Sequence, residues 1–162
     1  MKQGCRYGTH RVLEPKGTLP QPAQKLDNTM ELYDNEMLIS VKTLNIDSAS
    51  FTQIKTACNG DTDRMAKMIT DIVAERGKMQ NPVTGSGGML IGTVKAIGPS
   101  FPAAGVKIGD TIATLVSLSL TPLKIHKIIS VNPKNDQVDV EAEAILFESG
   151  IFAVLPNDIP EK

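Results

Sequence analysis

Aromatic side chains are scarce in this 162-residue sequence, which has no Trp, two Tyr and four Phe. Proteins that bind single-stranded nucleic acid stack bases on aromatic rings, so this shortage argues against such a surface. The net charge is only −1, which gives no electrostatic reason to expect a nucleic-acid or anionic membrane partner. No apolar run approaches the roughly 20 residues that span a bilayer. We therefore expect neither a nucleic acid nor a membrane as partner.

Cysteine and histidine are also rare, at two residues each. Cys5 and Cys58 lie far apart and form no CxxC pair, so we expect two free thiols in a reducing cytoplasm. The count excludes a structural zinc site made of four cysteines. The spacing of His10 and His126 does not indicate a metal site. The N-terminus lacks the apolar run of a signal peptide, which also favours a cytoplasmic location.

Glycine and proline are plentiful, with 13 and 10 residues, and indicate many turns, as in a barrel rather than a helical bundle. With 41% hydrophobic and 22% charged residues, the sequence is that of an ordinary globular protein. Residues 1–34 show little periodicity and predict an extended arm that wraps a larger body. Residues 35–162 would form that body as one domain.

Alternating and helical patterns predict a mainly β fold, of the α+β kind, with two short-to-medium helices. One helix begins at Ser48 and ends before Asn59, and a longer one covers 62–76, with Asp61 as its N-cap and Gly77 just after it. Strands are expected at 36–46, 90–97, 111–118, 123–131 and 137–144, with a last apolar segment at 145–155. Together these elements would form a partly open barrel.

Three acidic residues, Asp139, Glu141 and Glu143, alternate with apolar ones along one of these strands. Such a run could be taken for a metal cluster. Neighbours on the same face of one strand stand about 7 Å apart, which favours a solvated strand face.

The most informative segment is rich in glycine: GGMLIGTV at 87–94, then IG at 97–98, then IGDTI at 108–112. This order resembles the pattern G-H-E-x-x-G-x-V, V-G, V-G-D-x-V of the medium-chain dehydrogenase/reductase family. The resemblance covers residues 36–160 and implies a GroES-like catalytic domain. Asp47, Gly88 and Met89 stand where that family has its three catalytic zinc ligands. Glycine has no ligand atom and a thioether suits zinc poorly, so we expect no metal site.

In the resembled family the chain continues into a Rossmann domain that holds the nicotinamide cofactor. Here no G-x-G-x-x-G follows a strand, and the string GSGG at 85–88 opens onto one instead. We therefore expect the N-terminal catalytic domain of a longer enzyme, with no cofactor-binding residue in this chain and no activity alone. By the same resemblance, NAD or NADP would be bound by the missing domain, and the full-length enzyme would be a homo-oligomer.

Four further segments carry a closer resemblance: GCRYGTHRVLEPKGTLPQPA at 4–23, TLNIDSASFTQI at 43–54, ERGKMQNPVTGSGGMLIGTV at 75–94 and ILFESGIFAVLP at 145–156. Together they resemble the L-erythro-3,5-diaminohexanoate dehydrogenase family of lysine fermentation. That resemblance implies NAD-dependent oxidative deamination of a small diamino acid to a 3-oxo acid and ammonia.

An amine substrate makes the loss of zinc tolerable, because a carboxylate can take the proton of an ammonium group. Asp47 is the first candidate for this base, and the alternative is that it only caps the helix that starts at Ser48. Glu148 follows an apolar run and is the second candidate, with a surface turn as its alternative.

Ser48, Thr84, Ser86 and Gly87 are the candidate substrate-binding residues. Small residues in a glycine turn let backbone N–H groups approach an anion such as the substrate carboxylate. The alternative is that the turn residues only satisfy the backbone angles.

Two other functions remain open from the sequence. The first is a zinc-free quinone or enoyl reductase, which would share the barrel and the missing ligands. The second is a GroES-like barrel that acts alone as a binding module.

Overall fold

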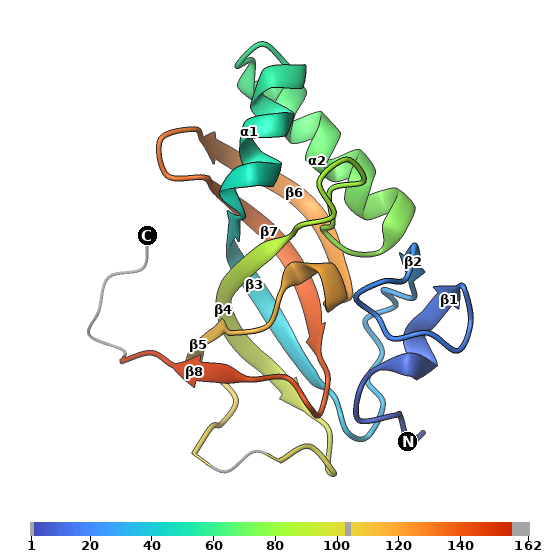
Figure 1. The fold of residues 1–162 in the computed structure, drawn as a ribbon. Helices are drawn as coiled ribbons and strands as arrows, with labels where there is room; N and C mark the ends of the chain where they lie inside the picture. The colour runs from blue at the N-terminus through green and yellow to red at the C-terminus, as the bar shows by residue number, and fades with distance from the viewer. Residues whose placement is uncertain (1, 103–104, 157–162) are drawn as a thin grey trace.

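The structure is a computed structural model that describes residues 2–102 and 105–156. Its centre is a six-stranded antiparallel sheet in the order β6–β7–β3–β4–β5–β8 (Figure 1). The strands are β3 (Met37–Ile46), β4 (Gly88–Ile97), β5 (Thr111–Thr114), β6 (Leu123–Asn132), β7 (Gln137–Leu146) and β8 (Phe152–Val154). Within the described residues β6 and β8 are the two edges of the sheet and are not paired with each other. The predicted mainly β, partly open fold is therefore confirmed.

Both predicted helices are present, α1 (Ser48–Ala57) and α2 (Thr62–Arg76). The Asp61 carboxylate accepts hydrogen bonds from the N–H groups of Asp63 and Arg64 and so caps α2. At the other end Gly77 has φ of 72°, the left-handed conformation that ends a helix. A Cβ at Gly77 would lie 2.0 Å from the Leu26 carbonyl oxygen, so only glycine fits this close contact.

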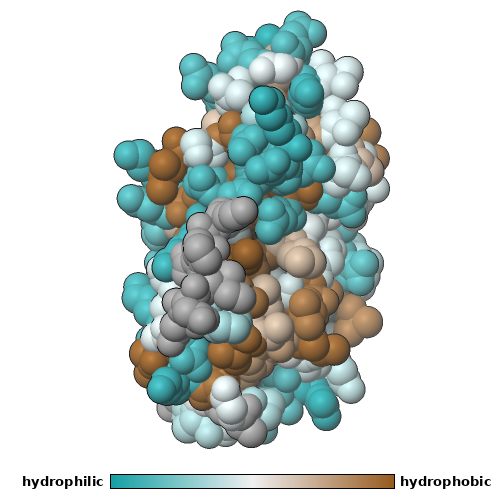
Figure 2. All heavy atoms as spheres, turned by 90° about the vertical axis from the view of Figure 1, so that its left-hand side faces the viewer, coloured by the Kyte–Doolittle hydropathy of each residue, from teal (hydrophilic) through white to brown (hydrophobic). Residues whose placement is uncertain are grey.

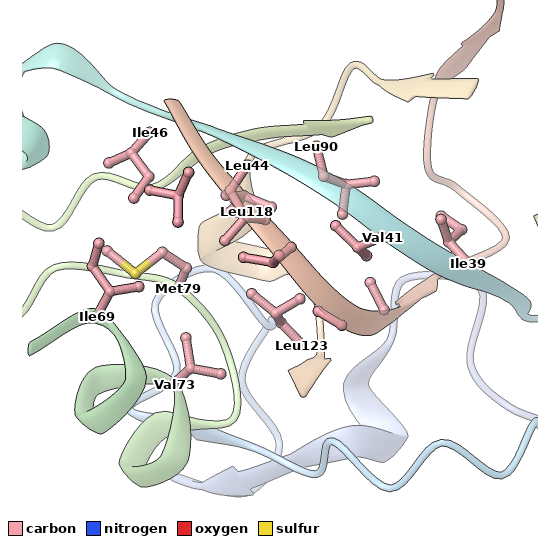
Figure 3. Close-up of a cluster of buried hydrophobic side chains, with 14 of the residues drawn as sticks. Ile39, Val41, Leu44, Ile46, Ile69, Val73, Met79, Leu90, Leu118 and Leu123 are labelled. Carbon is pink, nitrogen blue, oxygen red and sulfur yellow. The ribbon is translucent and has the colours of Figure 1, made fainter. Parts of the chain in front are cut away.

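One hydrophobic core lies between the sheet and α2 (Figure 3). Ile69 and Val73 of α2 point toward Met79 and toward Leu44 of the central strand β3. The other labelled side chains in Figure 3 come from β3, β4, β6 and the turn η2 (Leu118–Leu120), and are Ile39, Val41, Ile46, Leu90, Leu118 and Leu123. The helix therefore closes one face of the sheet.

One predicted strand is shorter than expected, and the last apolar segment does not form a single strand. β5 stops at Thr114 rather than at residue 118, because the 3-10 turn η2 carries Leu118 into the core. The apolar segment 145–155 is divided: its first two residues complete β7, and only Phe152–Val154 form β8. Apolarity alone did not distinguish a continuous strand from two strand ends and a turn.

The N-terminal arm has local structure of its own. It contains the turn η1 (Thr9–Arg11) and a two-stranded sheet of β1 (Val12–Glu14) and β2 (Lys25–Leu26). The arm therefore contains regular structure that the prediction of an extended conformation did not include. The boundary at residue 34 is a prediction that the structure leaves untested.

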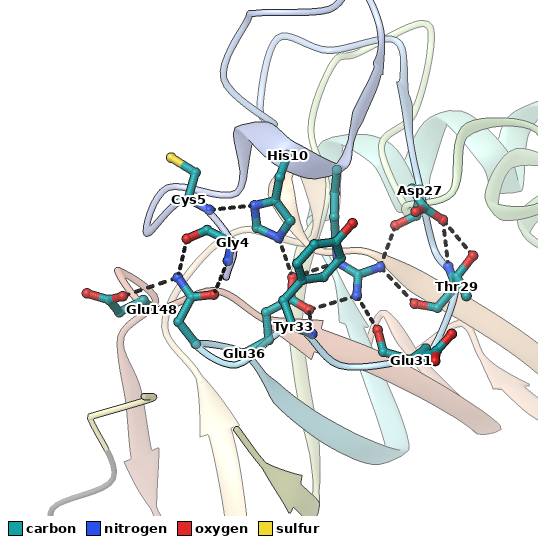
Figure 4. Close-up of polar contacts among 11 residues, drawn as sticks. Gly4, Cys5, His10, Asp27, Thr29, Glu31, Tyr33, Glu36 and Glu148 are labelled. Atoms are coloured by element: carbon teal, nitrogen blue, oxygen red, sulfur yellow. Dashed lines mark hydrogen bonds and ion pairs between the residues drawn. The ribbon is translucent and has the colours of Figure 1, made fainter. Parts of the chain in front are cut away.

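A buried ion pair connects this arm to Glu36, the residue just before β3 (Figure 4). Arg11 donates from Nε and one terminal nitrogen to both carboxylate oxygens of Glu36, at 2.6 and 2.7 Å. Its three remaining N–H groups donate to the backbone oxygens of Asp27, Thr29 and Glu31. All five donors of the guanidinium group are therefore used within the protein.

Glu36 is the acceptor at the centre of this network. His10 and the N–H of Tyr33 also bond to its carboxylate, at 2.8 and 2.9 Å. Burial alone would raise the pKa of Glu36, but these hydrogen bonds and the charge of Arg11 lower it to about 2. Glu36 is therefore ionised at neutral pH.

The segment between β1 and β2 is held from the other side by residues that follow α2. Lys78 is fully buried, and its Nζ donates to the carbonyls of Pro20 and Gln21 at 2.7 and 3.1 Å. Burial, together with the charge of Arg76, lowers the pKa of Lys78 to about 7. A neutral amine still has two N–H donors, which matches the two carbonyls that it meets.

Candidate functional site

The candidate site lies where β3 ends and β4 begins. Asp47 follows the last residue of β3, and its N–H donates to the carbonyl of Gly87 at 2.9 Å. This bond holds the start of α1 against the loop of residues 79–87 that leads into β4. Most of the candidate site residues of the sequence analysis therefore come together at this junction.

The Asp47 side chain is exposed, and its Oδ1 accepts a hydrogen bond from the N–H of Ala49 at 3.2 Å. The predicted capping role is therefore present. A surface carboxylate with this single bond to backbone stays open to a ligand, so capping does not remove the second prediction, that it binds an ammonium group.

Three hydroxyl groups form a cluster beside this cap. Ser50 Oγ lies 2.8 Å from Thr84 Oγ1 and 2.5 Å from Ser86 Oγ, and the last two atoms are 3.0 Å apart. Ser50 is fully buried, Ser86 is half-buried and Thr84 is exposed. We call Ser50, Thr84 and Ser86 the hydroxyl cluster; it reaches from the first turn of α1 to the surface.

Sequence reasoning named Ser48 in this turn and missed Ser50. Ser48 is exposed, whereas Ser50 lies on the buried side of α1 with Phe51 and Ile54. The signal was available, since Ser50 and Ile54 are four residues apart and share one helix face.

A buried asparagine shapes the loop that carries Thr84 and Ser86. Asn81 donates from its side chain to Gln53 Oε1 at 2.8 Å and to the Ser50 carbonyl at 3.4 Å. Its Oδ1 accepts the N–H of Val83 at 2.8 Å, and its backbone N–H donates to the Ser86 carbonyl. Asn81 therefore positions the hydroxyl cluster, although no sequence motif pointed to it.

The two glycines at the start of β4 are required by close backbone contacts. A Cβ at Gly87 would lie 2.7 Å from the Ser119 nitrogen, and one at Gly88 would lie 2.1 Å from the Asn45 oxygen. Gly88 also has φ of 145°, which side chains rarely adopt. These contacts explain the glycines structurally, while a role of Gly87 in substrate binding stays a prediction.

Glu148 lies away from this junction. Leu146, two residues before it, pairs with Met37 at the start of β3, whereas Asp47 follows the end of the same ten-residue strand. A strand of that length spans about 30 Å. Glu148 is half-buried, accepts a hydrogen bond from Asn35 Nδ2 at 3.2 Å and lies 3.9 Å from Arg6 Nε (Figure 4). The two candidate carboxylates therefore do not share one site.

The acidic face of β7 carries polar contacts with its neighbours. Glu143 binds Lys95 and His126, at 3.0 and 2.8 Å. Asp139 accepts hydrogen bonds from Thr43, Ser130 and Gln137, and Glu141 is exposed. Across residues 2–102 and 105–156, no group of three or more His, Cys, Asp or Glu is placed to hold a metal ion. In the same part of the chain, no helix has the length and apolarity to cross a membrane.

The described residues do not form the strand, glycine turn and helix that hold a nicotinamide dinucleotide in a Rossmann domain. Such cofactors bind at the end of a parallel strand that leads into a helix through a glycine turn. Every described pair of strands is antiparallel, and the glycine turn at 85–88 leads into strand β4.

Comparison with known proteins gives the family. The sequence model of the L-erythro-3,5-diaminohexanoate dehydrogenase N-terminal domain matches residues 10–156. The L-erythro-3,5-diaminohexanoate dehydrogenase of Fusobacterium nucleatum is 62% identical over 162 residues, which are 99% of this chain and 47% of that protein. The enzyme of the same name from Acetoanaerobium sticklandii is 60% identical over 160 residues, 98% of this chain and 46% of its own length.

The chain thus spans about half the length of these relatives. Because the matched region covers nearly all of the sequence, the chain belongs to the L-erythro-3,5-diaminohexanoate dehydrogenase N-terminal domain family.

Proposed function

We propose that this chain is the substrate-binding half of a dehydrogenase that oxidatively deaminates a small diamino acid, L-erythro-3,5-diaminohexanoate. The observation that carries the proposal is the 62% identity to an enzyme of that name over 99% of the chain. The products would be 5-amino-3-oxohexanoate and ammonia, as the resemblance of the sequence implies. The enzyme would be a zinc-independent cytoplasmic member of the medium-chain dehydrogenase/reductase family, with a GroES-like N-terminal domain and NAD or NADP on its other half.

Asp47 is the residue that we assign to the reacting ammonium group. Its carboxylate is exposed and lies at the junction of β3 and β4, next to the loop that holds the hydroxyl cluster. An anion there would bind the ammonium ion and accept its proton, which leaves the neutral amine needed for oxidation. The overall reaction would replace the amine by an oxygen from water and release ammonia, and a nicotinamide bound outside this chain would supply the hydride acceptor.

The hydroxyl cluster is the part of the site that we assign to the substrate carboxylate. Thr84 and Ser86 are the accessible members and can donate hydrogen bonds to an anion, and buried Ser50 holds both in place. Ser48 on the exposed face of α1 and the backbone of Gly87 border the same position. An ammonium partner and hydroxyl donors then stand side by side, as an amino acid requires.

Substitution of Asp47 tests this assignment. The protein would be a chimera in which residues 1–156 are followed by the C-terminal half of the Fusobacterium enzyme. Asp47→Asn keeps a good N-cap but loses the anion, so we expect kcat/KM for 3,5-diaminohexanoate to fall about 100-fold, with thermal stability unchanged. Turnover is followed by formation of the reduced nicotinamide.

Glu148→Gln is the matched variant in the same chimera. Because Glu148 lies at the opposite end of β3, we expect it to affect turnover far less than Asp47→Asn. Equal losses in both variants would support the second carboxylate as a catalytic residue, through contacts outside this chain. Near-normal turnover of Asp47→Asn would contradict the assignment of the base.

A further inference from the structure

The outer face of the sheet, which α2 does not cover, divides into a charged part and an apolar part. On β7, β3 and the far end of β4 it carries the exposed residues Glu141, Ser40, Lys42 and Lys95 and the ion pair of Lys95 with Glu143. Polar side chains of this kind belong in water. This part of the face therefore needs no cover.

The apolar part lies where β4, β5 and β8 meet. In the register of these strands Ile91 pairs with Ala113 and Ala113 pairs with Ala153, so all three point to the same side. The next row toward the candidate site holds Met89, Leu115 and Ile151, and the Leu115 N–H donates to the Ile151 carbonyl at 2.8 Å. We call these six residues, Met89, Ile91, Ala113, Leu115, Ile151 and Ala153, the apolar corner.

The outer row of the apolar corner is strongly exposed. Met89 is 42% exposed, Leu115 54% and Ile151 62%. Figure 2, which views the side of the molecule where β5 and β8 lie, shows hydrophobic residues gathered in the lower half of this surface, below hydrophilic ones. A contiguous apolar patch of this kind marks an interface more often than a solvated surface.

Two observations bear on what could cover the apolar corner. β8 is the last strand described, and it contains Ala153 and begins just after Ile151. The chain therefore leaves the sheet next to two residues of the apolar corner. The matched relatives are about twice as long as this chain, and the family model is that of an N-terminal domain. In those proteins about half of the sequence therefore follows the matched region, which ends just after β8.

We propose that the C-terminal half of the enzyme packs against the apolar corner. Met89 directly follows Gly88 at the start of β4, and the Gly87 carbonyl accepts a hydrogen bond from the Asp47 N–H. The apolar corner therefore borders the candidate site. A C-terminal half placed there lies along the edge of that site and excludes water from one side of it. This inference concerns the covering of a surface and does not depend on which substrate the enzyme takes.

Cysteine labelling tests the proposal. Leu115→Cys and Ile151→Cys are made in a Cys5→Ser background, in the 162-residue chain and in the chimera with the C-terminal half of the Fusobacterium enzyme. The matched control is Ile129→Cys, since Ile129 is also an exposed apolar residue, 58% exposed, but lies on β6 at the other edge of the sheet. The rate of reaction with a maleimide is followed by mass spectrometry.

We expect positions 115 and 151 to react at least about tenfold more slowly in the chimera, because a covered thiol is out of reach of the reagent. Position 129 should react at the same rate in both proteins. Equal rates at 115 and 151 in both proteins would overturn the proposal. Protection in the 162-residue chain that grows with its concentration would also overturn it, because a second copy would then cover the face.

The same labelling in the full-length Fusobacterium enzyme, at the positions aligned with 115, 151 and 129, gives a second scaffold in case the chimera folds poorly. Labelling rates are read without any turnover. A failure of the substrate assignment and a failure of the interface are therefore distinguishable.

Discussion

Glu36 is the residue on which the attachment of the N-terminal arm depends most. It is fully buried and takes hydrogen bonds from Arg11, His10 and the Tyr33 N–H. Removing one partner of a buried ion pair leaves the other charge uncompensated, which costs far more than an exposed pair is worth. The attachment of the arm is therefore expected to weaken when this one carboxylate is lost.

Glu36→Gln tests the contribution of this carboxylate, because it removes the charge and keeps the shape of the side chain. We expect a loss of about 3 kcal/mol in the free energy of unfolding at pH 7, measured with urea. Because the pKa of Glu36 falls from 4.5 to about 2 on folding, its contribution is complete above pH 4.5 and is lost as pH falls toward 2. The difference between the two proteins should shrink over that range. The exposed pair of Lys67 and Asp71 is the control, since Lys67→Ala should cost less than about 0.5 kcal/mol.

Lys78 gives a pH dependence of the same sign as Glu36, over a higher pH range. Its pKa falls from 10.5 to about 7 on folding, so between these values the unfolded chain binds a proton that the native protein lacks. Stability from this group therefore rises with pH from 7 toward 10.5. We expect the unfolding free energy of the wild type to rise relative to that of Lys78→Met between pH 7 and 9. A difference that stays constant over this range would contradict the lowered pKa.

At the scale of elements, α2 shows what local sequence can predict. Its bounds follow from an N-cap aspartate, a helical apolar stripe and a terminal glycine, all within 17 residues of one another. The loop of residues 79–87 could not be predicted in the same way. Its conformation depends on Asn81 meeting Gln53 and Ser50 from α1, contacts between residues 28 and 31 positions apart.

The two caps of α2 should differ in cost. Asp61→Ala loses two hydrogen bonds to exposed N–H groups, and we expect a loss of about 1 kcal/mol. Gly77→Ala forces a Cβ to within 2.0 Å of the Leu26 oxygen and also strains φ, so a loss of more than about 2 kcal/mol is expected. Chemical denaturation of the two variants measures both values. A smaller cost for Gly77→Ala than for Asp61→Ala would show that β2 does not hold the end of α2.

For the whole molecule, strand pairing determines which features of the fold and the site could be predicted from the sequence. The mainly β class and the group of Asp47, Thr84, Ser86 and Gly87 were predictable, because those residues flank neighbouring ends of β3 and β4. The separation of Glu148 from Asp47 was not, since it follows from β7 running antiparallel to β3. The ion pair of Arg11 and Glu36 was also missed, because a long-range contact defines it. Buried Ser50 was missed although it shares a helix face with Ile54.

Turnover by the unsubstituted chimera tests the central claim most directly. Residues 1–156 replace the N-terminal half of the Fusobacterium enzyme, which is 62% identical in this region. If this chain is the substrate half of the same enzyme, the chimera should oxidise 3,5-diaminohexanoate with kcat/KM within about tenfold of the parent, since one power of ten is about 1.4 kcal/mol in the barrier. A folded chimera that binds its cofactor but leaves the diamino acid unchanged, or reduces an α,β-unsaturated ketone instead, would contradict the account.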